Sequence, residues 1–277
     1  MSTMSSTNGR HRAATRALPP RKRLDPISVL GELLVTFGVL CLLFGFWEVV
    51  WTNVQSGREQ NVVAQQLEDQ WRDKNPRPLT EPPEGAAFAR LYIPAFGSDF
   101  NFSVVKGVKD EDLDRGPGHY LDSQLPGEPG NFAMAGHRVG RGSPFNDLGL
   151  LKTCDSVVVE TAGSWDIYRV LPIDVPPDQR QAALSKCMSG KLASRMSQGE
   201  YAQVNGRYIT TPNDVEVINP IPHNPRVEVK AGDASLLTMT TCHPQYSNTE
   251  RMIVHAVKVR TDDKKPGFVP AELTKEV

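Results

Sequence analysis

Apolar residues are concentrated in one long run near the start of the chain and in short alternating runs from residue 86 onward. The long run, residues 27–51, carries charges only at Glu32 and Glu48 and is long enough to cross a bilayer. Carboxylates near its two ends can reach the headgroup region, and Trp47 and Trp51 cluster at its C-terminal end. We therefore predict an uncleaved membrane anchor. A cleaved signal peptide is the alternative, but bulky residues stand where its small-residue cleavage site belongs.

The short runs have the composition of β-strands and are separated by Gly, Pro, Asn and Asp. Such punctuation predicts an all-β sandwich or barrel, and the missing alternation with helices argues against a doubly wound sheet. We expect strands at 88–93, 100–105, 131–135, 156–160, 166–175, 208–211, 215–218, 235–241 and 251–259.

Two segments differ from this pattern. Residues 176–207 are helix-permissive and are interpreted as an insertion between two strands. Residues 52–75 are polar with Val63, Leu67 and Trp71 at helical spacing, which predicts a partly helical stalk or, alternatively, a partner-binding helix. A proline-rich extended spacer follows at 76–84. The expected domains are a basic tail at 1–26, the anchor at 27–51, a stalk and linker at 52–85, a β domain at 86–260 and a charged, loose tail at 261–277.

The charge distribution indicates a topology for the anchor. Lys and Arg number 31 against 32 Asp and Glu, a net charge of −1, so the chain has no overall basic footprint for nucleic acid. A mean hydropathy of −0.37 excludes a polytopic transporter. The basic residues of 1–26 flank the anchor, and the positive-inside rule then predicts a cytoplasmic N-terminus and an extracellular β domain.

The chain has 4 cysteines, of which Cys41 lies in the predicted anchor. The other three, Cys154, Cys187 and Cys242, leave at least one thiol unpaired in a monomer. A free thiol of this kind is a candidate nucleophile. Because there is no Cys-x-x-Cys or His-Glu-x-x-His pattern, we expect no metal site.

A disulfide between Cys154 and Cys187 is favoured by the expected hairpin of strands 156–160 and 166–175. In simple antiparallel register residue 154 lies roughly opposite residue 173, and the insertion leaves soon afterwards. Cys187 can then fold back to Cys154 and leave Cys242 free. Two isolated, half-buried cysteines are the alternative.

Cys242 closes a strand in which Leu237 and Met239 share one face and Cys242 lies on the other. If Leu237 and Met239 face the core, the thiol emerges outside. If the next run pairs with this strand as a hairpin, Arg251 lies beside the thiol. A guanidinium there favours thiolate and can bind a developing oxyanion. The alternative is a structural cysteine beside a solvated arginine.

A general acid or base is also needed, and His137 is the best placed of the 6 histidines. It follows the apolar strand 131–135, where Gly136 permits a sharp turn. His243 follows Cys242 directly and should point to the opposite face.

Three motifs in this order resemble the sortases, the cell-wall transpeptidases of Gram-positive bacteria. They are Gly-Asn-Phe-Ala-Met-Ala-Gly-His-Arg at 130–138, Leu-Thr-Met-Thr-Thr-Cys at 237–242 and Glu-Arg-Met-Ile-Val-His-Ala at 250–256. Residues 93–94, 115–120 and 143–148 look like the class E branch found in actinobacteria. The resemblance covers about 88–260, and the insertion at 176–207 is its main departure.

The resemblance implies an eight-stranded β-barrel with short helices, preceded by a single N-terminal transmembrane helix. Cys242 would attack the Thr–Gly bond of a C-terminal sorting signal of Leu-Pro-x-Thr-Gly or Leu-Ala-x-Thr-Gly type. His137 would protonate the leaving amine. Arg251, assisted by Thr241, would hold the sorting peptide and stabilise the oxyanion.

The resemblance also implies partners. Tyr120 would help to select Ala over Pro in the signal, and a packing aromatic is its alternative role. The acyl acceptor would be an amine of a lipid-linked peptidoglycan precursor or of a pilin, and no cofactor is implied. Alternatives are a hydrolytic thiol peptidase, a pilin-polymerising sortase and a catalytically silent wall-binding module.

Overall fold

The computed structural model describes residues 25–72 and 82–274, and contacts divide the chain into two units after Phe46. The predicted basic tail up to residue 24 and the proline-rich spacer up to residue 81 lie outside the described residues. Helix α1 (Pro26–Arg72) begins in the first unit. Its segment Pro26–Trp47 has a mean hydropathy of 2.3 and is long and apolar enough to cross a membrane. This helix fits the predicted single-pass anchor.

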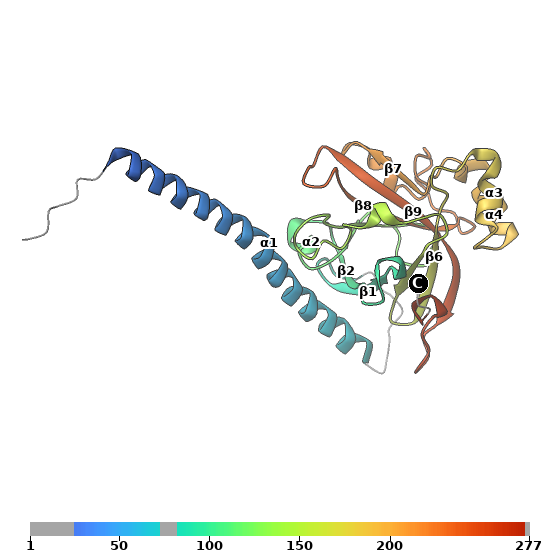
Figure 1. Cartoon of the computed structure of the whole chain (residues 1–277). Helices are drawn as coiled ribbons and strands as arrows, with labels where there is room; N and C mark the ends of the chain where they lie inside the picture. Colours follow the sequence, from blue (N-terminus) through green and yellow to red (C-terminus); the bar gives the residue numbers. More distant parts are fainter. Residues whose placement is uncertain (1–24, 73–81, 275–277) are drawn as a thin grey trace, which may run out of the picture. The chain divides into compact units, whose positions relative to one another are not determined.

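Within residues 82–274, eight strands close into a barrel in the order β6-β5-β1-β2-β3-β4-β8-β9, with β6 paired to β9 (Figure 1). Strand β7 (Arg207–Thr210) pairs with the first part of β9, on the edge that β6 occupies further along. The predicted eight-stranded barrel is therefore confirmed. Its strands are β1 (Ala87–Tyr92), β2 (Asn101–Lys106), β3 (Gly118–His119), β4 (Gly130–Ala135), β5 (Ser156–Glu160), β6 (Ser164–Val170), β8 (Ser235–His243) and β9 (Glu250–Asp263).

Alternating side chains of these strands build the barrel core. Leu237 and Met239 of β8 pack there with Phe132 and Met134 of β4. Because side chains alternate along a strand, the intervening residues of β8 face outward, and Cys242 belongs to that outward set. The expected assignment of the two faces of β8 is thus correct.

The part of α1 in the second unit packs on the barrel. Val63 and Leu67 are buried in a cluster with residues of β1 and β2. The Lys264 ammonium lies 3.6 Å from the centroid of the Trp71 ring, a cation–π contact. The apolar side chains at helical spacing in the stalk therefore pack against the barrel of the same chain. The stalk is helical as far as Arg72.

The insertion folds into two short helices, α3 (Arg180–Leu184) and α4 (Gly190–Met196). Both contribute to a second hydrophobic cluster that includes the outward residues Leu236 of β8 and Val257 of β9. The insertion consequently covers the outer face of the barrel at the start of β8.

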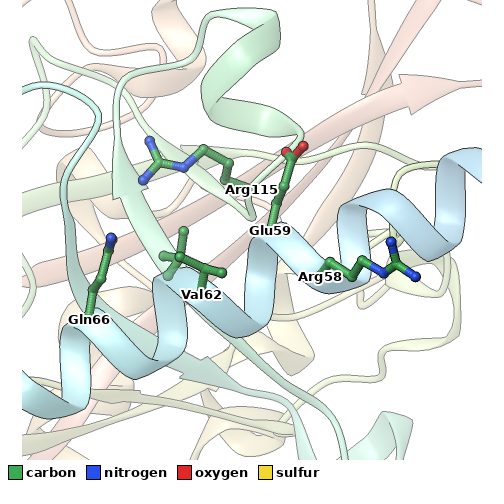
Figure 2. Close-up of a pocket in the computed structure, with 6 residues that line it drawn as sticks. Arg58, Glu59, Val62, Gln66 and Arg115 are labelled. Atoms are coloured by element: carbon green, nitrogen blue, oxygen red, sulfur yellow. The ribbon is translucent and has the colours of Figure 1, made fainter.

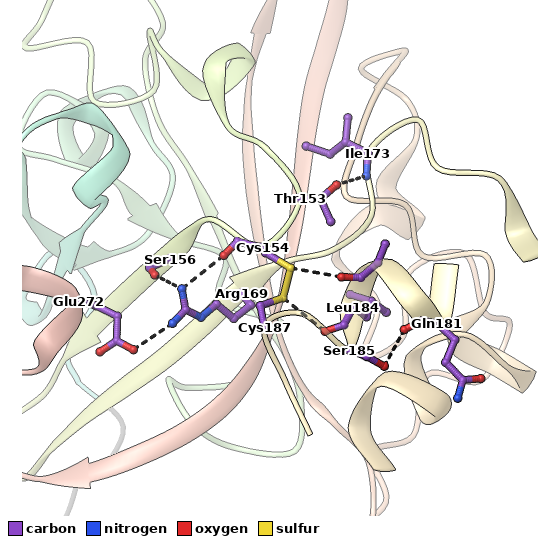
Figure 3. Close-up of a disulfide and its surroundings, with 11 residues drawn as sticks. Thr153, Cys154, Ser156, Arg169, Ile173, Gln181, Leu184, Ser185, Cys187 and Glu272 are labelled. Atoms are coloured by element: carbon purple, nitrogen blue, oxygen red, sulfur yellow. Dashed lines mark hydrogen bonds and ion pairs between the residues drawn. A yellow bond between two sulfur atoms is a disulfide. The ribbon is translucent and has the colours of Figure 1, made fainter. Parts of the chain in front are cut away.

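A disulfide joins the insertion to the barrel. Cys154 and Cys187 are bridged with their Cα atoms 5.7 Å apart, and Figure 3 shows the bridge between the barrel and α3. Arg169 reinforces this corner by donating to the Cys154 carbonyl at 3.3 Å and to Glu272 Oε1 at 3.0 Å. Ser156 pairs with Arg169, so the hairpin register places residue 154 opposite 171, not 173.

Three strand predictions need correction. The strand expected at 166–175 ends at Val170 of β6. Residues 215–218 form a 3₁₀ helix, η5 (Val215–Ile218), and not a strand. The Val217 carbonyl there accepts a hydrogen bond from the Asn131 side chain at 3.3 Å, so a side chain replaces a neighbouring strand. Strand β3 was missed because two residues, one of them glycine, carry no alternation.

The C-terminal segment is more ordered than expected. Strand β9 continues beyond residue 260 to Asp263, and helix α5 (Ala271–Thr274) follows. Glu272 of α5 forms an ion pair of 2.8 Å with Arg260. The prediction of a loose tail from residue 261 is therefore wrong for residues 261–274, because these charges pair with the barrel.

Candidate active site

The first element of the candidate site is the open end of the β8–β9 hairpin. Cys242 lies directly opposite Arg251 in the antiparallel register, as the sequence predicted. Both side chains also meet Asn248 of the connecting loop. The Cys242 thiol donates to Asn248 Oδ1 at 3.4 Å, and Arg251 Nη1 donates to the Asn248 carbonyl at 3.4 Å. Thiol and guanidinium therefore share one small region of the surface.

His137 is brought to the same end by β4. Strand β4 pairs in parallel with β8 as far as Ala135 opposite Thr240. The junction continues one residue further, since the Gly136 amide donates to the Thr240 carbonyl at 3.1 Å. His137 thus follows the end of β4 at the level of Cys242, near the end of β8.

Gly136 is required at this turn by a close approach. A Cβ at residue 136 would lie 2.6 Å from the Phe145 ring, which is shorter than carbon–carbon contact allows. The turn therefore needs glycine at residue 136, as the sequence suggested, because there is no room there for a side chain.

The surroundings of His137 set its protonation. Burial lowers the pKa of the His137 imidazole below its ordinary value, and the Arg141 charge lowers it further. Asp114, whose Oδ1 lies 3.7 Å from His137 Nε2, acts in the opposite direction and raises the pKa. Asp114 also forms an ion pair with Arg141. A partly buried imidazole with an acidic neighbour can donate and accept a proton near neutral pH.

Two predicted substrate-binding residues have different positions. The Tyr120 hydroxyl lies 2.9 Å from the hydroxyl of Thr240, which is on the outward face with Cys242. The Thr241 hydroxyl instead donates to the Gly136 carbonyl at 2.8 Å, and its side chain is buried. Thr241 therefore stabilises the junction of β4 and β8, and this geometry lends no support to a substrate contact.

Three residues of the site were missed by sequence reasoning: Asp114, Arg138 and Asn248. Arg138 Nη1 donates to the Cys242 carbonyl at 3.3 Å and lies 2.6 Å from His243 Nδ1. All three lie outside the strands in loops or beside short helices, where apolar periodicity indicates nothing about position. The one available signal was that Arg138 follows His137 directly.

Other features bear on alternative chemistries. Among the described residues, the free cysteines are Cys41 and Cys242, and no group of His, Cys, Asp or Glu could hold a metal ion. A pocket of about 330 Å³ lies elsewhere, between α1 and the loop before β3. Figure 2 shows Val62 at this pocket with Arg58 and Arg115.

A family model described as "Sortase domain" matches residues 91–259, which is more than half of the chain. The match includes the three residues assigned from the motifs: His137, Cys242 and Arg251.

Named relatives agree with this match. The chain is 30% identical to Sortase SrtE1 of Streptomyces coelicolor over 92% of its own length but spans only 64% of that relative. It is 29% identical to Sortase SrtE2 of the same organism, over 95% of each chain. The solved structure of the SrtF sortase from Corynebacterium diphtheriae is 53% identical, with a TM-score of 0.70 over 73% of this chain and 98% of that one. The SrtE relatives support the class E resemblance.

Proposed function

The chain belongs to the sortase family, and we propose that it is a membrane-anchored cysteine transpeptidase that attaches proteins to the cell wall. Its substrates are proteins with a C-terminal sorting signal of Leu-Pro-x-Thr-Gly or Leu-Ala-x-Thr-Gly type. Its acceptor is an amine of a lipid-linked peptidoglycan precursor, and a pilin amine is the alternative. The anchor leaves the N-terminus in the cytoplasm and the barrel outside.

One observation carries the proposal. The Cys242 thiol and the Arg251 guanidinium lie opposite each other and both contact Asn248, at the same end of the sheet where His137 leaves β4. Acyl transfer through a thioester requires a nucleophile, a cation for the oxyanion and a proton donor close together, and these strand ends provide all three.

The first half-reaction forms the thioester. The Cys242 sulfur attacks the carbonyl carbon of the threonine in the signal, and the carbonyl oxygen becomes an oxyanion near Arg251. When the Thr–Gly bond breaks, His137 gives a proton to the leaving glycine amine. The products are an acyl-Cys242 thioester and the released C-terminal fragment.

The second half-reaction resolves the thioester. His137 takes a proton from the incoming amine as the amine attacks the thioester carbonyl. An amide bond forms, and Cys242 leaves as the thiolate. Atoms balance without a cofactor, since one amide bond is exchanged for another.

Tyr120 is the proposed contact to the second residue of the signal. Its bond to Thr240 holds it on the outward face that carries the nucleophile. A panel of peptides with Ala or Pro at that position, assayed with wild-type protein and Tyr120→Phe, tests this role.

The full-length protein in detergent, incubated with a sorting peptide and an amine, tests the function. Mass spectrometry should detect the peptide joined to the amine and an acylated Cys242. Hydrolysis alone would favour a thiol peptidase, and binding without turnover would favour a silent wall-binding module. Either result would overturn the proposal.

A further inference from the structure

Arg138 connects the two strand ends that carry His137 and Cys242. It follows His137 in the chain, yet its Nη1 donates to the carbonyl oxygen of Cys242 at 3.3 Å. The same nitrogen lies 2.6 Å from Nδ1 of His243. One guanidinium therefore contacts both the backbone carbonyl of Cys242 and the side chain of the next residue, His243.

These contacts determine the tautomer of His243. Arginine has donors but no acceptor, so Nδ1 of His243 must accept the hydrogen bond and carry no proton. The ring proton then resides on Nε2, which lies 4.0 Å from the Glu250 carboxylate of β9. The imidazole thus accepts a hydrogen bond from Arg138 on one side and lies near the start of β9 on the other.

The position of Arg138 extends the junction between β4 and β8. Regular pairing ends at Ala135 and Thr240, and the Thr241 hydroxyl then holds the Gly136 carbonyl at 2.8 Å. The next link is the Arg138 bond to Cys242, which is made to the nucleophile residue itself. Since His137 lies between Gly136 and Arg138, its backbone is tied to β8 on both sides.

We propose that Arg138 is a positioning residue, which sets the separation of His137 and Cys242 by holding the Cys242 carbonyl and neutral His243 together. The inference rests on the proposed transpeptidation, in which His137 must reach an amine bound at the Cys242 carbon. Small displacements of reacting groups can cost up to about a hundredfold in rate. Arg138 is half-buried and its Nε is buried with no hydrogen-bond partner in the described part of the chain, an arrangement that costs stability.

The test uses full-length protein with Arg138→Met, His243→Leu, His243→Asn and the double variant Arg138→Met/His243→Leu. Arg138→Met and His243→Leu should each lower kcat about tenfold, with KM changed less than about twofold. The amide oxygen of His243→Asn can accept from Arg138, so this variant should retain most of the wild-type kcat. The double variant should lose no more than either single variant, because both remove one linkage.

Arg260→Met is the matched control, because Arg260 pairs with Glu272 at the opposite end of β9. It should leave kcat unchanged. Arg138→Met with a kcat within twofold of wild type would overturn the proposal. Losses that multiply in the double variant would do so as well.

A spectroscopic arm separates failure of this inference from failure of the proposed function. Nitrogen-15 spectra of histidine-labelled protein, with His243 assigned by its loss in His243→Asn, report the tautomer without any substrate. The wild type should show His243 protonated on Nε2 only, and Arg138→Met should show a mixture. A wild-type His243 protonated on Nδ1 would overturn the linkage even if transpeptidation is observed. An Nε2 tautomer that shifts in Arg138→Met would support the linkage even in a protein without turnover.

Discussion

The outward face of strands β4, β8 and β9 has a covered half and an open half. In the covered half, Thr238 and His255 are 0% exposed and lie within 2.8 Å of each other through Oγ1 and Nδ1. In the open half, Cys242 and Arg251 remain partly accessible on the same strands. The alternation of side chains is identical in both halves, so the difference comes from what lies above the strands.

Two segments form the cover. The insertion packs on Leu236 and Val257, and the loop around η5 accepts hydrogen bonds from the Asn131 side chain through the Val217 and Asn219 carbonyls. Strand β8 runs on beyond this cover, and at about 3.3 Å per residue Cys242 lies roughly 20 Å from Leu236. The strand is thus held firmly at one end and presents its nucleophile at the other.

The two halves also differ in the pKa of the histidine that each contains. Burial lowers the pKa of His255 in the covered half to about 3, and the nearby His223 charge adds to this effect. Burial also lowers the pKa of His137 in the open half, but Asp114 acts in the opposite direction and raises it. Full burial gives a histidine that stays neutral at physiological pH, whereas partial burial beside a carboxylate leaves one able to exchange protons.

The largest expected effect comes from removing the open half's chemistry. Cys242→Ala, His137→Ala and Arg251→Ala should each lower transpeptidation by orders of magnitude, since the three act as a unit, while the melting temperature stays unchanged. Peptide transfer to an amine is the measurement, with Cys41→Ala and Arg260→Ala as controls that should retain full rates. Near wild-type turnover in one of the three variants would remove that residue from its proposed role.

The sequence predicted the strands of both halves better than it predicted their surroundings. Alternation in 235–241 correctly separated Leu237 and Met239 from the outward residues, and the hairpin placed Arg251 opposite Cys242. Contacts made by Asp114, Arg138 and Asn248 could not be predicted, because loop paths depend on tertiary contacts and not on a repeating pattern. Residues 215–218 alternate as a strand would, and only their tertiary contacts, among them the bond from Asn131 to the Val217 carbonyl, show that they form η5.

Removing the disulfide should weaken the attachment of the insertion that covers the outward face. Cys154→Ser/Cys187→Ser opens a loop of sequence separation 33, and the chain-entropy model gives a loss of about 3–4 kcal/mol in the free energy of unfolding. Denaturant titration of the full-length protein measures this loss. Transpeptidation at 25 °C should remain, because the bridge lies at the insertion. A clear loss of transpeptidation in the variant while it is still fully folded would show that the open half depends on the disulfide in the covered half.

Neutral His255 makes the covered half sensitive to acid. Its folded-state pKa lies below the unfolded value, so the protein loses stability as the pH falls below about 6.5, where the unfolded histidine binds a proton and the folded one does not. Between pH 7 and pH 5 this contribution is roughly 2 kcal/mol. His255→Gln should reduce the pH dependence of the unfolding free energy by that amount, whatever its effect at pH 7. An unchanged slope would mean that His255 is protonated in the fold.

The smallest expected effect is a shift in the acid limb of the rate profile in the open half. Because the first step needs a Cys242 thiolate and a protonated His137 together, kcat/KM should rise with pH to a break set by the pKa of His137 and should fall again at alkaline pH. Burial places the acid limb below the ordinary pKa of histidine. A profile that is flat across neutral and alkaline pH would argue against this acid–base pair.

Two charge changes should move that acid limb in opposite directions. Asp114 raises the His137 pKa, so Asp114→Asn should shift the limb to lower pH. Arg141 lowers it, and Arg141→Met should therefore shift the limb to higher pH, the more so because the freed Asp114 then acts on His137 alone. Arg260→Met, which removes a charge at the far end of β9, should leave the limb in place. Shifts of the same sign in Asp114→Asn and Arg141→Met would show that the acid limb does not belong to His137, since one histidine cannot respond alike to the loss of an anion and the loss of a cation.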